Sequence, residues 1–334
     1  MGIKNEGVEI ARLVAAISIV WLHTVGAVGY LPLEYSARWD RWAVPFFIAA
    51  SLWFSNPINE SRTPWEYIKM RFLRLYPVFL VWNVFYLVIR LVSGVFFHSS
   101  LHMDGISFFK QLFFDGFAHH LWFLSFLILV DFGIAISGLI GISSWITVPT
   151  SATCLAVMSY LPSSIYPTFG SYLLGMSWWS LPAVFMVVIL KPFNQFLIES
   201  KGYCVKFSAI FLIIGILLTW NSSYGARNSY MEAASGVFIF FGFLLAGHGR
   251  KTHIPRTIRN LAAMSAGIYL VHVLYVEAFQ HISFSLTQSV RSSYGVISIF
   301  TLSLLFSIMT LLLLNKLGIK WIFSGFSLAK RSGN

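Results

Sequence analysis

Three ionisable residues, Glu9, Arg12 and His23, lie within one apolar stretch near the start of the chain. If the segment from Gly7 to Gly26 is an α-helix, the step from Arg12 to His23 returns to nearly the same face, about 16 Å further along the axis. Glu9 precedes Arg12 by three positions and shares that face. Ionisable groups are costly within a membrane-spanning helix and face the protein interior or a water-filled cavity. The pattern therefore predicts a reaction site or a substrate path inside the membrane.

The composition indicates a membrane protein. The chain has 334 residues, of which 57% are hydrophobic and 10% are charged. These proportions exclude a soluble domain with a solvated surface and predict an all-α, polytopic membrane protein. One span needs about 20 apolar residues. By that measure we predict about ten transmembrane helices, over Gly7–Gly26, Trp42–Ser55, Tyr76–Phe97, Leu121–Gly141, Trp145–Leu161, Phe169–Leu190, Phe207–Trp220, Tyr230–Gly247, Ala262–His281 and Val296–Leu317.

The Lys and Arg residues are distributed unevenly between the two sides of this arrangement. Of the 23, sixteen fall on the side of the two termini and six on the other side, with Arg12 inside the first span. Cytoplasmic loops are the ones enriched in Lys and Arg, so we predict that both termini are cytoplasmic. The net charge of +11 then reflects topology, and we expect no nucleic-acid partner. Arg12 also argues against a cleaved signal peptide.

A second chemically suggestive stretch, TPWEYIKMRFLRLYP, begins at Thr63 on the predicted inner side. Thr63 and Glu66 have the spacing of a capping box, which predicts the start of a short interfacial helix. We expect Pro77 to end that helix before the next span. Arg71 and Arg74 are three positions apart and form a forked pair suited to phosphate groups. The alternative is that both arginines only reflect the enrichment of cytoplasmic loops in basic residues.

Histidines and small residues elsewhere in the chain can each be interpreted as functional or as structural. Four histidines precede the fourth predicted span, and two of them have helical i, i+4 spacing. No Cys or carboxylate pattern accompanies them, so we predict that they are solvated loop histidines and that they hold no metal. They are His98, His102, His119 and His120. Ser51 follows two alanines in an aromatic segment, where small residues favour close helix packing. His272 lies in the middle of the ninth predicted span, where an ionisable group is a candidate for function.

Five segments together resemble the acyltransferase 3 family of bacterial membrane acyltransferases, which O-acetylate cell-surface glycans. They are EIARLVAAISIVWLH from Glu9, VPFFIAASLWF from Val44, RFLRLYP from Arg71, HLWFLS from His120 and SAGIYLVH from Ser265. The resemblance covers nearly the whole chain, and the segments follow one another in the order of the family. One departure is Leu52, because family members usually have glycine after the serine that corresponds to Ser51. The resemblance implies a single transmembrane acyltransferase domain over residues 1–334, with no appended extracellular domain.

The family implies an acyl-coenzyme A donor, bound from the cytoplasm, and transfer of an acetyl group to a hydroxyl of an envelope glycan such as a lipopolysaccharide O-antigen. The acceptor would be reached from the membrane or the outer side. The resemblance thus implies acetyl-coenzyme A as co-substrate, a polysaccharide or lipid-linked glycan and membrane lipids as partners, and a place in the bacterial cytoplasmic (inner) membrane. Neither a metal nor a nucleic acid is implied.

The resemblance also implies roles for individual residues. His23 would be the general base or a covalent acyl carrier, two possibilities that the sequence does not separate. Glu9 and Arg12 would orient each other or the donor, or form a purely structural pair. The coenzyme A phosphates would be held by residues of the inner segment, namely Arg71, Arg74 and Tyr76. A second group would line the cavity, namely Ser51, His120, Trp122, Tyr269 and His272.

A rival reading from another class of protein is a transporter or flippase for an envelope sugar. In that case the polar stripe of the first helix would be a substrate path. Transporters often contain matching interrupted helices in two halves, and the sequence has no convincing internal repeat. A third possibility is an acyltransferase that uses another donor, such as succinyl-coenzyme A. The acceptor hydroxyl, the acyl group and the oligomeric state are not readable from the sequence.

Overall fold

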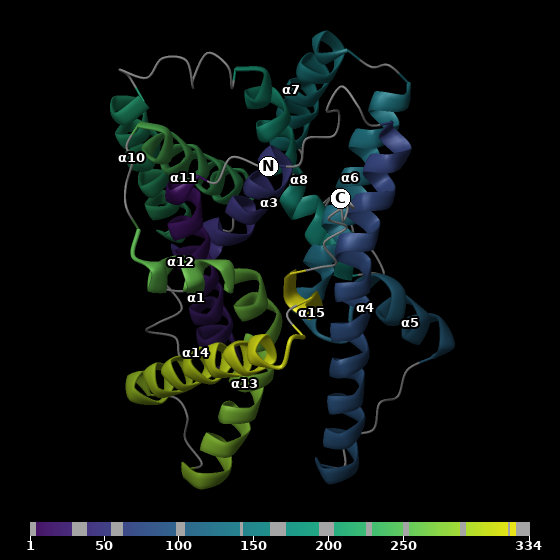
Figure 1. Cartoon of the computed structure of the whole chain (residues 1–334), viewed down its shortest axis with the longest axis vertical. Coiled ribbons are helices and arrows are strands. Elements are labelled where there is room, and N and C mark those ends of the chain that lie inside the picture. The colour runs from purple at the N-terminus through teal and green to yellow at the C-terminus, as the bar shows by residue number, and fades with distance from the viewer. Residues whose placement is uncertain are drawn as a thin grey trace, which may run out of the picture. The chain divides into compact units, whose positions relative to one another are not determined.

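A computed structural model describes residues 5–28, 39–54, 63–97, 104–140, 143–160, 172–193, 204–224, 229–249, 254–287, 292–319 and 321–324. These residues form helices and short connections, with no strand among them, as the ribbons in Figure 1 show. The all-α prediction is therefore confirmed. The elements are α1 (Glu6–Val28), η1 (Trp39–Trp42), α3 (Ala43–Phe54), α4 (Pro64–Phe97), α5 (Gly105–Lys110), η2 (Gln111–Asp115), η3 (His119–Leu121), α6 (Trp122–Leu139), α7 (Ser144–Tyr160), α8 (Tyr172–Leu190), η5 (Lys191–Phe193), α10 (Cys204–Tyr224), α11 (Ser229–Gly249), α12 (Arg256–Ala263), α13 (Ser265–Thr287), α14 (Ser293–Lys316) and α15 (Trp321–Ser324).

Six helices in the described part of the chain are long and apolar enough to cross a membrane, and a bent pair of helices raises the number to seven. These six are α1 and α14 together with most of α4, α6, α10 and α11. The apolar helices α7 and α8 are shorter over their described residues, and α3 has only 12 residues. The chain is thus a multi-pass membrane protein, while the count of about ten spans stays a prediction. Both termini lie outside the described residues, and their cytoplasmic location stays a prediction.

The prediction that a short interfacial helix ends before Pro77 was wrong. The capping box forms, because Thr63 N donates to Glu66 Oε2 at 3.0 Å and Glu66 N donates to Thr63 Oγ1 at 3.2 Å. The helix that starts there is α4, which continues through Pro77 for 34 residues. A proline removes one backbone donor from a helix, and membrane helices tolerate that loss when neighbouring groups compensate for it. Arg71, Arg74 and the predicted span Tyr76–Phe97 therefore belong to one helix.

The ninth predicted span, Ala262–His281, also differs from the structure. The chain breaks at Met264, and α12 and the described part of α13 meet at a bend of 63° (Figure 1). The reason lies in composition, because α12 contains Arg256, Arg259 and Asn260, whereas α13 begins with an apolar run. A polar, amphipathic helix is more stable along a membrane surface than within the bilayer.

The described helices divide into two compact units, each assembled from three separate stretches of the chain. Unit 1 comprises Met1–Ser55, Ser143–Pro162 and Trp179–Leu313. Unit 2 comprises Asn56–Ile142, Ser163–Trp178 and Leu314–Asn334. Each unit contains its own cluster of buried apolar side chains.

The central helix of unit 1 is α1, which packs against α3, α11, α12 and α13. Its buried face consists largely of small side chains, including Ala11, Ala15 and Ala16, all of them inaccessible to solvent. Small residues allow membrane helices to approach closely. Gly7 is the extreme case, since a Cβ atom there would lie 2.2 Å from the carbonyl oxygen of Phe243 in α11. The sequence of α1 therefore fixes how near its neighbours come.

Hydrogen bonds tie both ends of α1 to other helices of unit 1. Asn5 caps the helix, because its Oδ1 accepts the backbone N–H of Val8 at 3.1 Å. Its Nδ2 donates to the carbonyl oxygen of Leu244 in α11 at 2.8 Å. At the opposite end, Gln280 Nε2 of α13 donates to the carbonyl oxygen of Ala27 at 2.7 Å. These contacts fix the position of α1 relative to α11 and α13.

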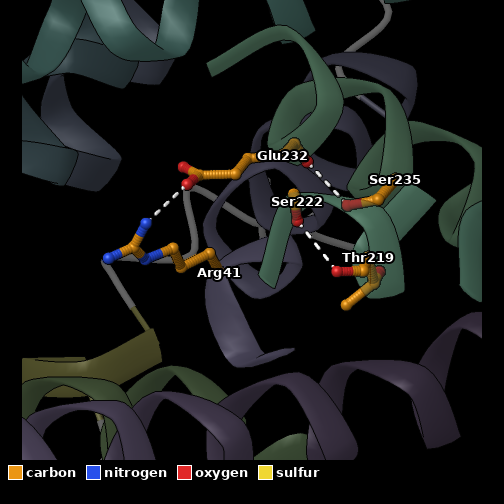
Figure 2. A network of polar contacts seen from close by, with 5 residues as sticks. All are labelled: Arg41, Thr219, Ser222, Glu232 and Ser235. Carbon is orange, nitrogen blue, oxygen red and sulfur yellow. Dashed lines mark hydrogen bonds and ion pairs between the residues drawn. The ribbon is translucent and has the colours of Figure 1, made fainter. Parts of the chain in front are cut away.

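The short helix η1 is held against the hairpin of α10 and α11, which lie side by side (Figure 1). Arg41 Nη1 lies 2.9 Å from Glu232 Oε1 of α11, and the hydroxyl of Ser235 donates to the Glu232 carbonyl oxygen at 2.8 Å (Figure 2). The ring of Trp39 contacts that of Trp220 edge-on, with centroids 4.9 Å apart. An ion pair and an aromatic contact therefore secure η1 from two sides.

Asp40, between these two anchors, has an unusual carboxyl group. Burial raises its pKa from 3.8 to about 7, and this effect exceeds that of a hydrogen bond with the Ser18 side chain, which lowers the pKa. A pKa that is higher in the folded state means that stability is fully retained below about pH 4 and falls as the pH rises toward 7. At neutral pH the carboxylate therefore destabilises the fold, by about 4 kcal/mol at most.

We expect Asp40→Asn to raise Tm at pH 8 and to raise it much less at pH 4.5, since asparagine has no charge to bury. Thermal unfolding of the detergent-solubilised protein at both values measures the effect. Asp104→Asn is the matched control, because Asp104 is exposed and its hydrogen bonds with Ser107 lower its pKa. An equal change in Tm at the two pH values for Asp40→Asn would contradict the assignment.

Unit 2 is built on the packing of α4 against α6. Its buried cluster contains Tyr67, Ile68 and Ala135, with Met70 and Phe132 packed against it. This cluster lies beside the part of α4 that contains Arg71 and Arg74.

Further along α4, Asn83 organises the turn between η2 and η3. Its Nδ2 donates to the carbonyl oxygens of Gln111 and Leu112 at 2.9 and 2.6 Å, and its Oδ1 accepts the N–H of Phe117. Gly116 ends η2 with a φ of +86°, a conformation that favours glycine. The fully buried Asn83 thereby adds hydrogen bonds to backbone groups of this irregular turn.

Candidate active site

The predicted pair of Glu9 and Arg12 forms near the start of α1. Arg12 Nη1 donates to Glu9 Oε1 at 3.2 Å, and the guanidinium lies 5.7 Å from the ring centroid of Phe54 in α3. Both side chains remain partly accessible, at 31% for Arg12 and 27% for Glu9. The pair can therefore meet a ligand while the Glu9 carboxylate offsets the arginine charge.

His23, toward the other end of α1, contacts a second histidine. Its ring centroid lies 5.0 Å from that of His272 in α13, at an interplanar angle of 39°. His272 is completely buried, whereas His23 is partly accessible. Two side chains that are 249 positions apart in the sequence thus form one imidazole pair, with His23 on its accessible side.

The backbone of α13 determines the tautomer of neutral His272. Its Nδ1 lies 3.1 Å from the carbonyl oxygen of Ile268. A carbonyl oxygen only accepts hydrogen bonds, so Nδ1 holds the proton. Nε2 then carries the lone pair that can accept a proton. The pair therefore contains a histidine whose basic nitrogen is defined by its own helix.

Aromatic side chains from two helices adjoin the imidazole pair. Tyr269, one turn before His272 on α13, has its ring centroid 6.0 Å from that of His272. Phe47 of α3 lies 6.4 Å from Tyr269 by the same measure. Ser51, one turn further along α3 than Phe47, shares its face of the helix and is partly buried. Helices α1, α3 and α13 therefore each contribute to this group, which we call the histidine cluster: His23, His272, Tyr269 and Phe47.

Apolar packing adjoins the histidine cluster at the end of α1. Val25 and Val28 form a buried cluster with Val296 and Ile299 of α14. Trp21, Leu22 and Phe279 pack against this cluster. Such packing lowers the local dielectric constant and strengthens electrostatic interactions nearby.

Three of the other predicted site residues lie on α4, in unit 2. Arg71 is 8% exposed, and its Nε donates to Asp131 Oδ2 of α6 at 2.7 Å. The other carboxylate oxygen of Asp131 accepts the hydroxyl of Tyr67 at 2.6 Å. Arg74 is exposed, one turn further along α4. Tyr76 is partly buried and stacks on Phe72 and Phe79, with ring centroids 4.6 and 5.9 Å away.

His120 and Trp122, the remaining candidates, belong to η3 and the start of α6 in unit 2. His120 is 1% exposed, and its ring contacts that of Tyr86 in α4 edge-on at 5.3 Å. Trp122 is 4% exposed and packs against Phe126, with centroids 5.8 Å apart. The idea that His120 is a solvated loop histidine is therefore wrong, because the packing of α4 and α6 buries it.

The structure thus brings together His23, Tyr269 and His272 in unit 1, and pairs Glu9 with Arg12 at the other end of α1. Sequence reasoning missed Asp131. A signal was present, because this aspartate interrupts the apolar run of α6 just as Arg12 interrupts that of α1.

No group of three or more His, Cys, Asp or Glu residues in the described ranges is arranged to hold a metal ion. His98 and His102 lie outside those ranges, so the absence of a metal site stays a prediction.

Comparison with known families matches residues 5–314 to the family model described as an acyltransferase domain. The chain belongs to the acyltransferase 3 family. Every candidate residue discussed above falls within the matched range. No curated protein and no solved structure gives a match to the chain. The family and the apolar helices together identify a multi-pass membrane acyltransferase.

Within this acyltransferase, the contact between His23 and His272 joins two of the five segments that resemble the family, EIARLVAAISIVWLH and SAGIYLVH. The histidine cluster supplies proton-accepting nitrogens and lies within the helices of unit 1. Acyl transfer to a hydroxyl group requires removal of one proton. The histidine cluster is therefore the candidate active site.

Proposed function

We propose that this protein transfers an acetyl group from cytoplasmic acetyl-coenzyme A to a hydroxyl of an envelope polysaccharide or lipid-linked glycan, in the bacterial cytoplasmic membrane. The observation that supports the proposal most directly is the imidazole pair of His23 and His272, with ring centroids 5.0 Å apart. Histidine changes its protonation state near neutral pH, which suits it to remove a proton from an acceptor hydroxyl.

In the proposed reaction, the acceptor oxygen attacks the carbonyl carbon of the thioester. His23 takes the hydroxyl proton as the new C–O bond forms, the C–S bond breaks, and the proton passes from His23 to the departing thiolate of coenzyme A. This sequence needs only one additional proton on the imidazole pair at any time.

A covalent route uses the same two residues. A ring nitrogen of His23 attacks the thioester, the coenzyme A thiolate leaves and takes the proton of the other His23 ring nitrogen, and the neutral acyl-imidazole then reacts with the acceptor hydroxyl. In this route Nε2 of His272 receives the hydroxyl proton and returns it to His23 as the imidazole leaves the acyl group. The mass of the intact protein after incubation with donor alone distinguishes the routes, because only the covalent one adds an acyl group to the protein.

The donor is proposed to bind through α4. Arg74 is exposed and the Arg71 side chain is 9% exposed, and an arginine fork matches the oxygens of a phosphate group. Tyr76 lies on the same helix, two residues beyond Arg74. Glu9 and Arg12 are proposed to orient each other, and as a pair to orient the donor. The acceptor is proposed to meet the histidine cluster, with Ser51 as a further lining residue. His120 and Trp122, which belong to unit 2, stay predicted lining residues.

The test is acyl transfer by the purified protein in lipid vesicles or detergent. Labelled acetyl-coenzyme A and an envelope glycan fraction are supplied, and transfer of label to glycan is measured, with succinyl-coenzyme A as the competing donor. We expect transfer from acetyl-coenzyme A and saturable binding of coenzyme A. A flippase has no use for coenzyme A, so a failure to bind it would favour that rival. Mass spectrometry of the glycan identifies the acyl group that was added.

A further inference from the structure

A buried polar network in unit 2 connects α4 to α6. Asp131 has a side chain that is 2% exposed, and both of its oxygens are used: Oδ2 by Arg71 Nε at 2.7 Å and Oδ1 by the Tyr67 hydroxyl at 2.6 Å. Tyr67 is itself 1% exposed. The short distances are those of charge-assisted hydrogen bonds. The surrounding side chains are apolar, including Ile68 and Ala135.

This arrangement orients the Arg71 guanidinium. A carboxylate bound at Nε fixes the plane of the guanidinium group. Asp131 thereby also determines the direction in which the Nη atoms of Arg71 point. The Arg71 side chain is 9% exposed, and Arg74, one turn further along α4, is exposed. Because Arg71 and Asp131 neutralise each other, Arg71 contributes directed hydrogen bonds there, while Arg74 contributes net positive charge.

A role limited to stability explains the network poorly. Removing two charges from water is costly, and an apolar pair of similar volume often gives equal or greater stability than a buried ion pair. A group of ligand-facing hydrogen-bond donors, by contrast, needs a fixed orientation, which a flexible arginine lacks without a second contact. The Tyr67 hydroxyl serves this purpose by restraining the carboxylate.

We propose that Asp131, restrained by Tyr67, is the positioning residue of the donor site and orients Arg71 toward the phosphate groups of the acyl-coenzyme A. The proposal rests on the proposed function, since it takes the donor to be a coenzyme A thioester. It adds two residues, on α4 and α6, that the resemblance to the family did not suggest. Asp131 does not touch the donor and acts through Arg71.

The test compares donor binding among variants of the full-length protein. Asp131→Asn keeps the side-chain volume but weakens the hold on Arg71, and we expect the Kd for coenzyme A and the KM for acetyl-coenzyme A to rise by about tenfold or more. The kcat at saturating donor should change much less. Tyr67→Phe keeps the ion pair and should raise KM by a smaller factor, about two- to fivefold. Lys69→Gln is the matched control, because Lys69 is an exposed cation on the same helix whose loss should leave KM within about twofold of wild type.

The decisive variant is the double substitution Arg71→Leu with Asp131→Leu. It removes both buried charges, so it should fold with a Tm close to that of the wild type, yet bind coenzyme A weakly. Wild-type donor affinity in this folded variant would overturn the proposal and leave the network a structural one. Should the double variant fail to fold, an unchanged KM in Tyr67→Phe together with an unchanged KM in Asp131→Asn would overturn it. If the wild type binds no coenzyme A at all, the proposed function itself fails.

Discussion

His23→Gln is expected to lower the rate of acyl transfer by about a thousandfold, because it removes the proton acceptor from the accessible side of the imidazole pair. Glutamine approximates the size of the ring and forms hydrogen bonds, but it does not accept a proton near neutral pH. Transfer of labelled acetyl groups at saturating donor measures the effect. Binding of coenzyme A should remain within a factor of about two, since binding and chemistry depend on different residues.

His281→Gln is the control for this substitution. His281 lies on α13, as His272 does, but near the end of the helix and exposed. Its loss should leave the transfer rate unchanged. A His23→Gln variant that folds and transfers acetyl groups at the wild-type rate would contradict both the general-base route and the covalent route.

Gly7→Ala should disrupt the fold of unit 1 and, with it, the histidine cluster. The added Cβ would lie 2.2 Å from the Phe243 carbonyl oxygen and 3.0 Å from the backbone nitrogen of Gly247, so two backbones must separate. Overpacking of this kind costs about 1–3 kcal/mol and shifts the packed helices. We expect a fall in Tm of several degrees and a loss of transfer activity, because α1 holds His23 against α13.

Gly26→Ala tests whether the effect depends on position. Gly26 lies on the same helix, and a Cβ atom there would meet nothing within 4 Å. Alanine favours a helix over glycine by up to about 1 kcal/mol, so this variant should be as stable as the wild type or slightly more stable. Equal Tm values for the two alanine variants would show that α1 and α11 do not pack as closely as described.

Local spacing made part of this structure predictable. The pairing of Glu9 with Arg12, the cap between Thr63 and Glu66, and the extent of α1 all depend on residues within one or two helical turns. In these cases the geometry of a single helix decides which side chains meet. The same reasoning placed His23 on the face of Arg12, about three turns away.

Contacts between distant helices were not predictable in this way. His23 meets His272 because α1 and α13 pack together, and no pattern within either helix specifies the partner. Asp131 likewise finds Arg71 only through the packing of α4 on α6. The continuation of α4 through Pro77 was also not predictable. The free-energy cost of the hydrogen bond that the proline removes depends on neighbouring groups, which the local sequence does not specify.

The hydrogen bond between His272 Nδ1 and the Ile268 carbonyl also limits where protons can travel. With Nδ1 bound to the backbone carbonyl oxygen, Nε2 is the nitrogen of His272 that can exchange a proton in the proposed reaction. A proton that Nε2 accepts would then leave from Nε2 again, so turnover would carry no net proton through His272. The proposed chemistry would differ in this respect from that of a proton-driven carrier.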